Sequence, residues 1–112
     1  MIKNLSKQQI LSKDEKYLRS KWSQALGLMF SKKKKLVFIF NKEKILSIHN
    51  IFVFFSIDVL FLDSNMKVVE IKRNFKPFSF YVPKAKAKYI IELPIGIDKN
   101  TSIEDKISMK SV

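Results

Sequence analysis

The chain has 112 residues, of which 46% are hydrophobic and 12% aromatic, so it can form one small core and is too apolar to be disordered. It has no cysteine and one histidine, which excludes disulfide frameworks, thiolate metal sites, cysteine nucleophiles and two-histidine metal motifs. Lys and Arg total 22 against 10 acidic residues, a net charge of +12. We therefore expect a basic single domain over residues 1–112, with no metal and no cofactor.

The positive charge has two interpretations. All of these basic residues except Arg19 and Arg73 are lysines, which is typical of compositional bias and favours solubility. The alternative is a polyanion-binding surface. Scattered lysines give only salt-sensitive attraction, whereas proteins that recognise specific bases rely on the arginine guanidinium. We expect weak, non-specific binding to nucleic acid. The lysines of the alternative surface are Lys32, Lys33, Lys34, Lys35, Lys84, Lys86 and Lys88.

The N-terminal segment contains no apolar stretch typical of a signal peptide, so a cytoplasmic protein is expected. Residues 1–13 are expected to form an extension or an edge element. The longest apolar run, Ile51 to Leu62, includes Ser56 and Asp58 and is well short of the roughly 20 residues that cross a bilayer. No membrane span is predicted.

Apolar spacing predicts one helix and then a series of strands. Residues 14–28 carry a one-sided apolar stripe, which predicts an amphipathic helix that ends near Gly27. Residues 36–40 form an apolar run rich in β-formers and predict a buried strand. The lysine run that precedes this strand is expected to be a connection.

The rest of the chain has the pattern of short strands. Residues 45–62 are long enough for two strands with a break near Ser56, and the polar residues 63–65 predict a turn that closes a hairpin. Residues 89–93 predict a strand that Pro94 and Gly96 end. The predicted fold is mainly β (α+β), a small barrel or sandwich of five to seven strands with one or two short helices.

Three ordered segments carry a family resemblance. The segments Gly27-Leu28-Met29-Phe30, Ile57 to Asp63 and Tyr89 to Gly96 resemble, in order and spacing, motifs of the domain-of-unknown-function 192 family. The resemblance spans residues 22–107. It implies a small mainly-β fold and no established activity.

The departures from the family pattern are also informative. His49 to Val53 is similar to the version of the pattern that archaeal members carry, so an archaeal source is expected. Family members often have arginines where this chain has Gln24 and Ser31. An anion site that depends on those arginines is therefore not predicted.

Two carboxylates lie in otherwise apolar strands, namely Asp58 and Glu92. A buried carboxylate is costly unless it is paired or hydrogen-bonded, so each has either a structural partner or a functional role. We expect the structural role for both and keep a shared ligand pocket with His49 as the alternative. His49 is the one side chain that titrates near neutral pH without a perturbation.

These observations favour a non-enzymatic module that binds a small ligand or a protein partner, with His49, Asp58 and Glu92 as hypothetical ligand-binding residues. The first alternative is the polyanion binder described above. The second is a small hydrolase or lyase that uses Asp58 and Glu92 as paired carboxylates. No catalytic residue is assigned.

Overall fold

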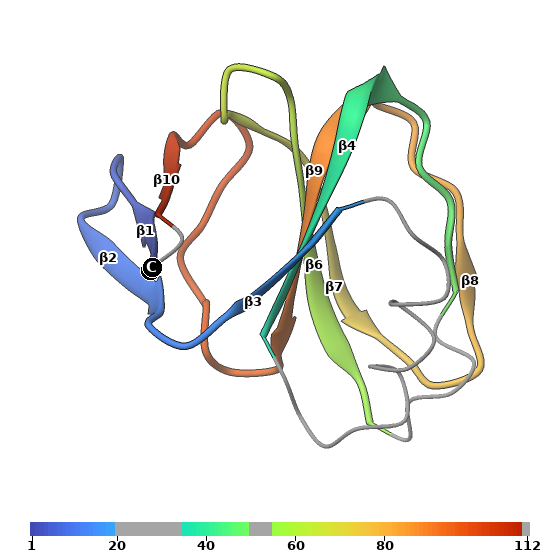
Figure 1. Cartoon of the computed structure of the whole chain (residues 1–112). Helices are drawn as coiled ribbons and strands as arrows, with labels where there is room; N and C mark the ends of the chain where they lie inside the picture. The colour runs from blue at the N-terminus through green and yellow to red at the C-terminus, as the bar shows by residue number, and fades with distance from the viewer. Residues whose placement is uncertain (20–34, 50–54, 111–112) are drawn as a thin grey trace.

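A five-stranded sheet forms the middle of the molecule (Figure 1). The computed structural model describes residues 1–19, 35–49 and 55–110. The sheet has the order β3-β4-β9-β6-β7, in which β3 and β4 are parallel and every other pair is antiparallel. Its strands are β3 (Lys16–Arg19), β4 (Leu36–Lys44), β6 (Ile57–Leu62), β7 (Val68–Phe75) and β9 (Ala87–Pro94).

Two smaller sheets flank the central one. The first has the order β10-β1-β2, and the second pairs β5 with β8. Figure 1 shows the first on one side of the central sheet and β8 on the other. Their strands are β1 (Ile2–Asn4), β2 (Gln9–Ser12), β5 (Ile48–His49), β8 (Phe80–Tyr81) and β10 (Ile107–Met109).

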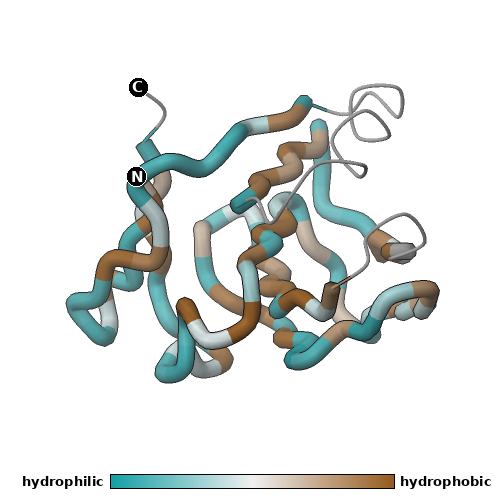
Figure 2. The backbone as a smooth tube through the Cα atoms, turned by 90° about the horizontal axis from the view of Figure 1, so that it is seen from below, coloured by the Kyte–Doolittle hydropathy of each residue, from teal (hydrophilic) through white to brown (hydrophobic). Residues whose placement is uncertain are grey.

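Both faces of the central sheet are covered by apolar side chains. One face, here called the β1-side face, packs with Ile2 and Leu11 of the three-stranded sheet. The other, the β8-side face, packs with Ile48 and Tyr81 of the two-stranded sheet. β6 lies between the two clusters and all six of its residues are buried. Figure 2 shows the hydrophobic colour concentrated in the central strands and the hydrophilic colour in the turns.

The mainly-β prediction is confirmed, whereas the predicted helices are not seen in the described residues. Residues 16–19 form β3, although the apolar spacing assigned them to a helix. Pairing with β4 gives these residues backbone partners, and it buries Leu18 and packs Tyr17 on the core. Tertiary pairing therefore overrides local spacing here. Residues 20–28, the remainder of that predicted helix, lie outside the described residues.

The predicted hairpin at residues 63–65 is confirmed. β6 and β7 are antiparallel neighbours, and the amide of Asp63 donates to the carbonyl of Lys67 at 2.9 Å. Oδ1 of Asp63 accepts from the amides of Asn65 and Lys67, an arrangement typical of Asp in tight turns. The predicted strand at residues 89–93 is also confirmed as part of β9, and Gly96 follows it with a φ of +92°. The strand count differs, because the structure describes ten strands, several with only two or three residues.

The segment between β9 and β10 is attached to the core by buried polar side chains. Asn4 of β1 is fully buried, and its Nδ2 donates to Oγ1 of Thr101 and to Oδ2 of Asp105, both at 2.9 Å. Asp105 also accepts from Nζ of Lys7 and from the amide of Ser102. Burial acts to raise the pKa of Asp105, but these hydrogen bonds and Lys7 together lower that pKa to about 2. The carboxylate is therefore ionised and fully partnered at neutral pH.

The substitution Asn4→Ala tests this attachment. It would remove the donor to the buried Oγ1 of Thr101 and one of the donors to Oδ2 of Asp105, so we expect a loss of roughly 1–3 kcal/mol in the free energy of unfolding. Urea denaturation followed by circular dichroism measures the loss. The control Asn100→Ala changes an exposed residue and should cost less than about 0.5 kcal/mol. Equal effects of the two substitutions would contradict the assignment.

Candidate functional site

Asp58 lies opposite an irregularity in β7. The register between β6 and β7 shifts there, so that Asp58 faces two residues, Arg73 and Asn74, in a β-bulge. Asn74 has a φ of +53°, and its backbone amide donates to Oδ1 of Asp58 at 3.0 Å. Nη1 of Arg73 contacts Oδ2 of Asp58 at 3.3 Å. Both carboxylate oxygens therefore have donors, which supports the structural role for Asp58.

The guanidinium of Arg73 extends this contact to the segment between β9 and β10. Nη1 donates to the carbonyl of Asp98 at 2.7 Å, and Nη2 contacts Oδ2 of Asp98 and the carbonyl of Thr101 at 3.3 Å. Oδ1 of Asp98 accepts from the hydroxyl and the amide of Thr101. The polar side chains on this face thus form one network that contains Asp58, and this network stabilises the fold.

Glu92 has no such network. It is a partly buried residue of β9, in register with Leu36 of β4 and Val59 of β6. Its carboxyl group makes no hydrogen bond and no ion pair with the residues that the structure describes. Burial raises the pKa of Glu92 to about 7, and none of the described cations is a cause that lowers it. At neutral pH this carboxyl group therefore exists as a mixture of acid and carboxylate.

The structure places Asp58 and Glu92 on opposite faces of the central sheet. Asp58 is in register with Leu93, which packs in the β1-side core, and Glu92 is in register with Val59, which packs in the β8-side core. Side chains of neighbouring residues on a strand point to opposite faces. The paired-carboxylate site is therefore not formed.

His49 lies on the same side of the sheet as Glu92. It belongs to β5, pairs with Phe80 of β8, and follows Ile48, which packs in the β8-side core. The backbone of His49 thus forms part of the layer that covers the face carrying Glu92. Of the three predicted site residues, the His49 backbone and Glu92 thus lie on the β8-side of the central sheet. Asp58 lies on the β1-side face.

The described lysines of the predicted polyanion surface fall into two places, with Lys35 before β4 and Lys84, Lys86 and Lys88 close together before and at the start of β9. Nζ of Lys35 contacts Asp14 at 2.9 Å, and Nζ of Lys88 lies 5.5 Å from the ring centre of Tyr89. Lys84 and Lys86 are exposed in the connection between β8 and β9. Lys32, Lys33 and Lys34 lie outside the described residues.

A cleft of about 570 Å³ on the β1-side face was not predicted from the sequence. It lies between the central sheet and β10, and it contains Arg19, Asn41 and Lys88 among its polar lining residues. Its apolar lining residues are Tyr17, Ile39, Phe40, Met66, Tyr89 and Met109. The lining tyrosines and methionines come from segments that lie far apart in the sequence. No local sequence pattern therefore predicts the cleft.

Two further features concern only the described residues. They contain no group of three or more His, Cys, Asp or Glu side chains placed to bind a metal ion. They also form no helix with the length and apolar character that a bilayer span requires.

The structure defines a small mainly-β protein with Asp58 hydrogen-bonded on one face of the central sheet and Glu92 without a partner among the described residues on the other. Residues 4–110 match the family model DUF192, described as "Uncharacterized ACR", and the chain belongs to this family. It is similar to a UPF0127 protein of Pyrococcus horikoshii, with 45% identity over 112 residues and 96% of each chain covered. This relative is archaeal, in agreement with the pattern at His49 to Val53.

Two solved structures have a similar fold. One, from Sinorhizobium meliloti 1021 and described as a proposed transcription regulator, has a TM-score of 0.75 at 20% identity and covers 83% of this chain and 78% of its own. The other, a protein of unknown function from Novosphingobium aromaticivorans, has a TM-score of 0.73 at 18% identity and covers 85% of this chain and 74% of its own. At these identities the comparison shows the fold alone.

The substitution Asp58→Asn tests the structural role of Asp58. The amide side chain has no negative charge to pair with Arg73, and its N–H group faces other hydrogen-bond donors. We therefore expect a loss of roughly 1–3 kcal/mol in the free energy of unfolding. Thermal and urea denaturation measure the loss. The matched control is Asp14→Asn, because Asp14 forms an exposed pair with Lys35, and solvent-exposed ion pairs contribute little to stability. An unchanged stability of Asp58→Asn would refute the structural role.

The pKa of Glu92 predicts a pH dependence of stability. The folded-state pKa is about 7, above the ordinary value of 4.5, so the folded protein binds more protons than the unfolded chain between these values. The free energy of unfolding should therefore fall as pH rises from about 4.5 to about 7, by up to roughly 3 kcal/mol, and change no further above that range.

The variant Glu92→Gln isolates this contribution. The difference in stability between Glu92→Gln and the wild-type protein should grow in favour of the variant as pH rises from 5 to 8. The control Glu104→Gln removes an exposed carboxylate and should follow the wild-type pH dependence. A constant difference across this pH range would show that the ionisation of Glu92 costs the folded state nothing.

Proposed function

We propose that residues 1–112 form one domain that binds a small ligand and catalyses no reaction, and that Glu92 is the ionisable group of the binding site. The observation that supports this proposal is the absence of a partner for Glu92 among the described residues. A carboxyl group in an apolar environment is costly, and every other buried carboxylate of the described residues has hydrogen-bond donors. A ligand that supplies the missing donor removes this cost.

The surroundings of Glu92 favour an organic ammonium ion as the ligand class. In the next row of the β8-side face, Phe38 of β4 and Phe61 of β6 flank Ile90 of β9. Diagonal neighbours in a sheet lie about 7–8 Å apart, within reach of aromatic side chains. Phe61 is fully buried, so Phe38 is the ring of this pair that a ligand could reach. A carboxylate near an aromatic ring combines ion pairing with cation–π attraction, which favours an ammonium group with an apolar body.

The net charge of +12 opposes the approach of a cation, but this opposition is limited in range. Salt screens charges beyond about 8 Å at physiological ionic strength. The ionised form of Glu92 also lacks a competing cation nearby, because burial is the cause of its raised pKa. The local attraction is therefore expected to exceed the long-range repulsion.

The same structure weakens the two alternatives. An enzyme with paired carboxylates would need Asp58 and Glu92 in one cleft, and the register separates them by the thickness of the sheet. For nucleic acid we propose only weak, sequence-independent attraction, because lysine gives salt-sensitive attraction and two of the described lysines of the predicted surface, Lys35 and Lys88, contact other side chains.

A titration with benzylammonium tests the proposal. Binding requires the ionised form of Glu92, so the affinity measured by calorimetry should be about tenfold higher at pH 8 than at pH 6. Benzyl alcohol, which has the same ring and no charge, should bind at least tenfold more weakly at pH 8. Glu92→Gln should remove the pH dependence and the preference for the cation, whereas Glu104→Gln should leave both unchanged. A pH-independent affinity, or equal binding by Glu92→Gln, would overturn the proposal.

A further inference from the structure

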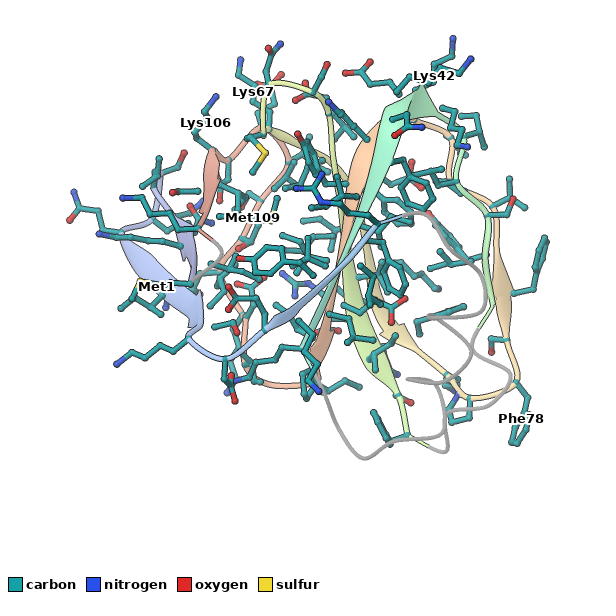
Figure 3. The ribbon with its side chains drawn as sticks, viewed as in Figure 1. Met1, Lys42, Lys67, Phe78, Lys106 and Met109 are labelled. Atoms are coloured by element: carbon teal, nitrogen blue, oxygen red, sulfur yellow. The ribbon has the colours of Figure 1, made fainter. Side chains whose placement is uncertain are left out.

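The cleft on the β1-side face is a second candidate site, separate from Glu92. It lies between β10 and the part of the central sheet formed by β3, β4 and β9, and Met66 from the turn between β6 and β7 completes it. Figure 3 shows Met109 on the side of β10 that faces the central sheet. Its volume of about 570 Å³ falls within the range of small-molecule sites, roughly 300–1,000 Å³.

The cleft contains two cations and no carboxylate among its lining residues. Arg19 is exposed at the end of β3 and makes no ion pair with the described residues. Lys88 of β9 likewise has no carboxylate partner there, and its Nζ lies over the ring of Tyr89. Unpaired cations beside an apolar surface are positioned to bind an anion, and a guanidinium can bind a carboxylate or a phosphate with two hydrogen bonds.

Three lysines lie next to lining residues along the chain or through strand pairing. Lys42 follows the lining residue Asn41, Lys67 follows the lining residue Met66, and Lys106 forms a β-bridge with Lys67. Figure 3 shows Lys42, Lys67 and Lys106 along the same upper edge of the molecule. This arrangement raises the local concentration of anions at the cleft.

The acidic groups near the cleft are already engaged. Glu15 accepts from the hydroxyl of Tyr17 and from the N-terminal amine of Met1, and its pKa is lowered to about 2 because these hydrogen bonds outweigh its burial. Glu43 accepts from the amide and the hydroxyl of Ser64. Glu15 therefore does not offset Arg19, whereas Glu43 lies close enough to Lys88 for that lysine to help lower the pKa of Glu43. Arg19 is thus the cation of the cleft with no acidic neighbour among the described residues.

The apolar lining favours a flat ring. Tyr17 and Tyr89 are half-buried, and Met66 and Met109 are half-buried methionines that pack against the same core. Thioether sulfur makes favourable contacts with aromatic rings, and tyrosine rings stack on planar groups. The hydroxyl of Tyr89 donates to no described residue and is a further donor for an anionic group.

We propose that this cleft binds a small aromatic anion, a flat ring system that carries a carboxylate or a phosphate. Arg19 and Lys88 contact the anionic group, and the ring lies among Tyr89, Met66 and Met109. The site is independent of the one at Glu92, because the two lie on opposite faces of the sheet.

Binding measurements with four probes test this inference. The probes are adenosine 5′-monophosphate with adenosine as its uncharged counterpart, and 2-naphthoate with 2-naphthylmethanol as its counterpart, all at 150 mM salt. We expect at least one anion to bind tenfold or more tightly than its counterpart, and the better of the two anions identifies phosphate or carboxylate as the preferred group. Methyl NMR signals of Met66 and Met109 should shift on titration.

Variants separate a built site from general attraction. Arg19→Met and Lys88→Met should each weaken binding of the preferred anion at least tenfold, and Glu92→Gln should leave it unchanged. Lys76→Met removes the same charge from an exposed residue outside the cleft and should change binding less than twofold. The inference is overturned if Lys76→Met weakens binding as much as Lys88→Met, if the Met66 and Met109 signals do not move, or if neither anion outcompetes its counterpart.

Discussion

The guanidinium of Arg73 is the interaction on which the arrangement of the β1-side face depends. It contacts Asp58 of β6 and, from the opposite direction, Asp98 and the carbonyl of Thr101 in the segment between β9 and β10. Thr101 in turn accepts from Asn4 of β1. One arginine therefore joins the edge strand β7, the central strand β6 and the segment that leads to β10.

This network determines where β10 lies and hence where the cleft is. β10 pairs with β1, and the bridge between Lys67 and Lys106 connects its start to the hairpin of β6 and β7. Met109 at the end of β10 then faces Tyr17 and Tyr89 across the cleft.

The two carboxylates that the sequence singled out differ because of the β-bulge. Asp58 lies opposite the bulge of β7, where an amide without a strand partner points at it. Glu92 lies in regular pairing between β4 and β6, where every amide is used by a neighbouring strand and none remains for a side chain. The same type of residue in the same type of apolar run therefore has a structural role in one position and an uncompensated charge in the other.

The sequence predicted the strands at residues 36–40 and 89–93 and the turn at Asp63 because these depend on local composition. It also predicted that Asp58 and Glu92 each need an explanation, since the cost of a buried carboxylate does not depend on the fold. It could not predict that the two lie on opposite faces, because this follows from the register between β6 and β9, which brings Asp58 beside Leu93 and Glu92 beside Val59. A shift of one residue in that register would have placed the two carboxylates on one face.

The alternation of β9 has a consequence for function. Tyr89 and Ile91 face the cleft side of the sheet, whereas Ile90 and Glu92 face the other side, so consecutive residues of one strand serve two different environments. The β1-side environment contains Arg19 and Lys88, and on the β8-side the carboxyl group of Glu92 forms no ion pair with the described residues. In the two proposals, β9 thus separates a site for an anion from a site for a cation by the thickness of a single sheet. The basic composition of the chain indicates attraction to anions. The proposed cation site at Glu92 on the β8-side face is compatible with that composition, because the sheet separates the two sites.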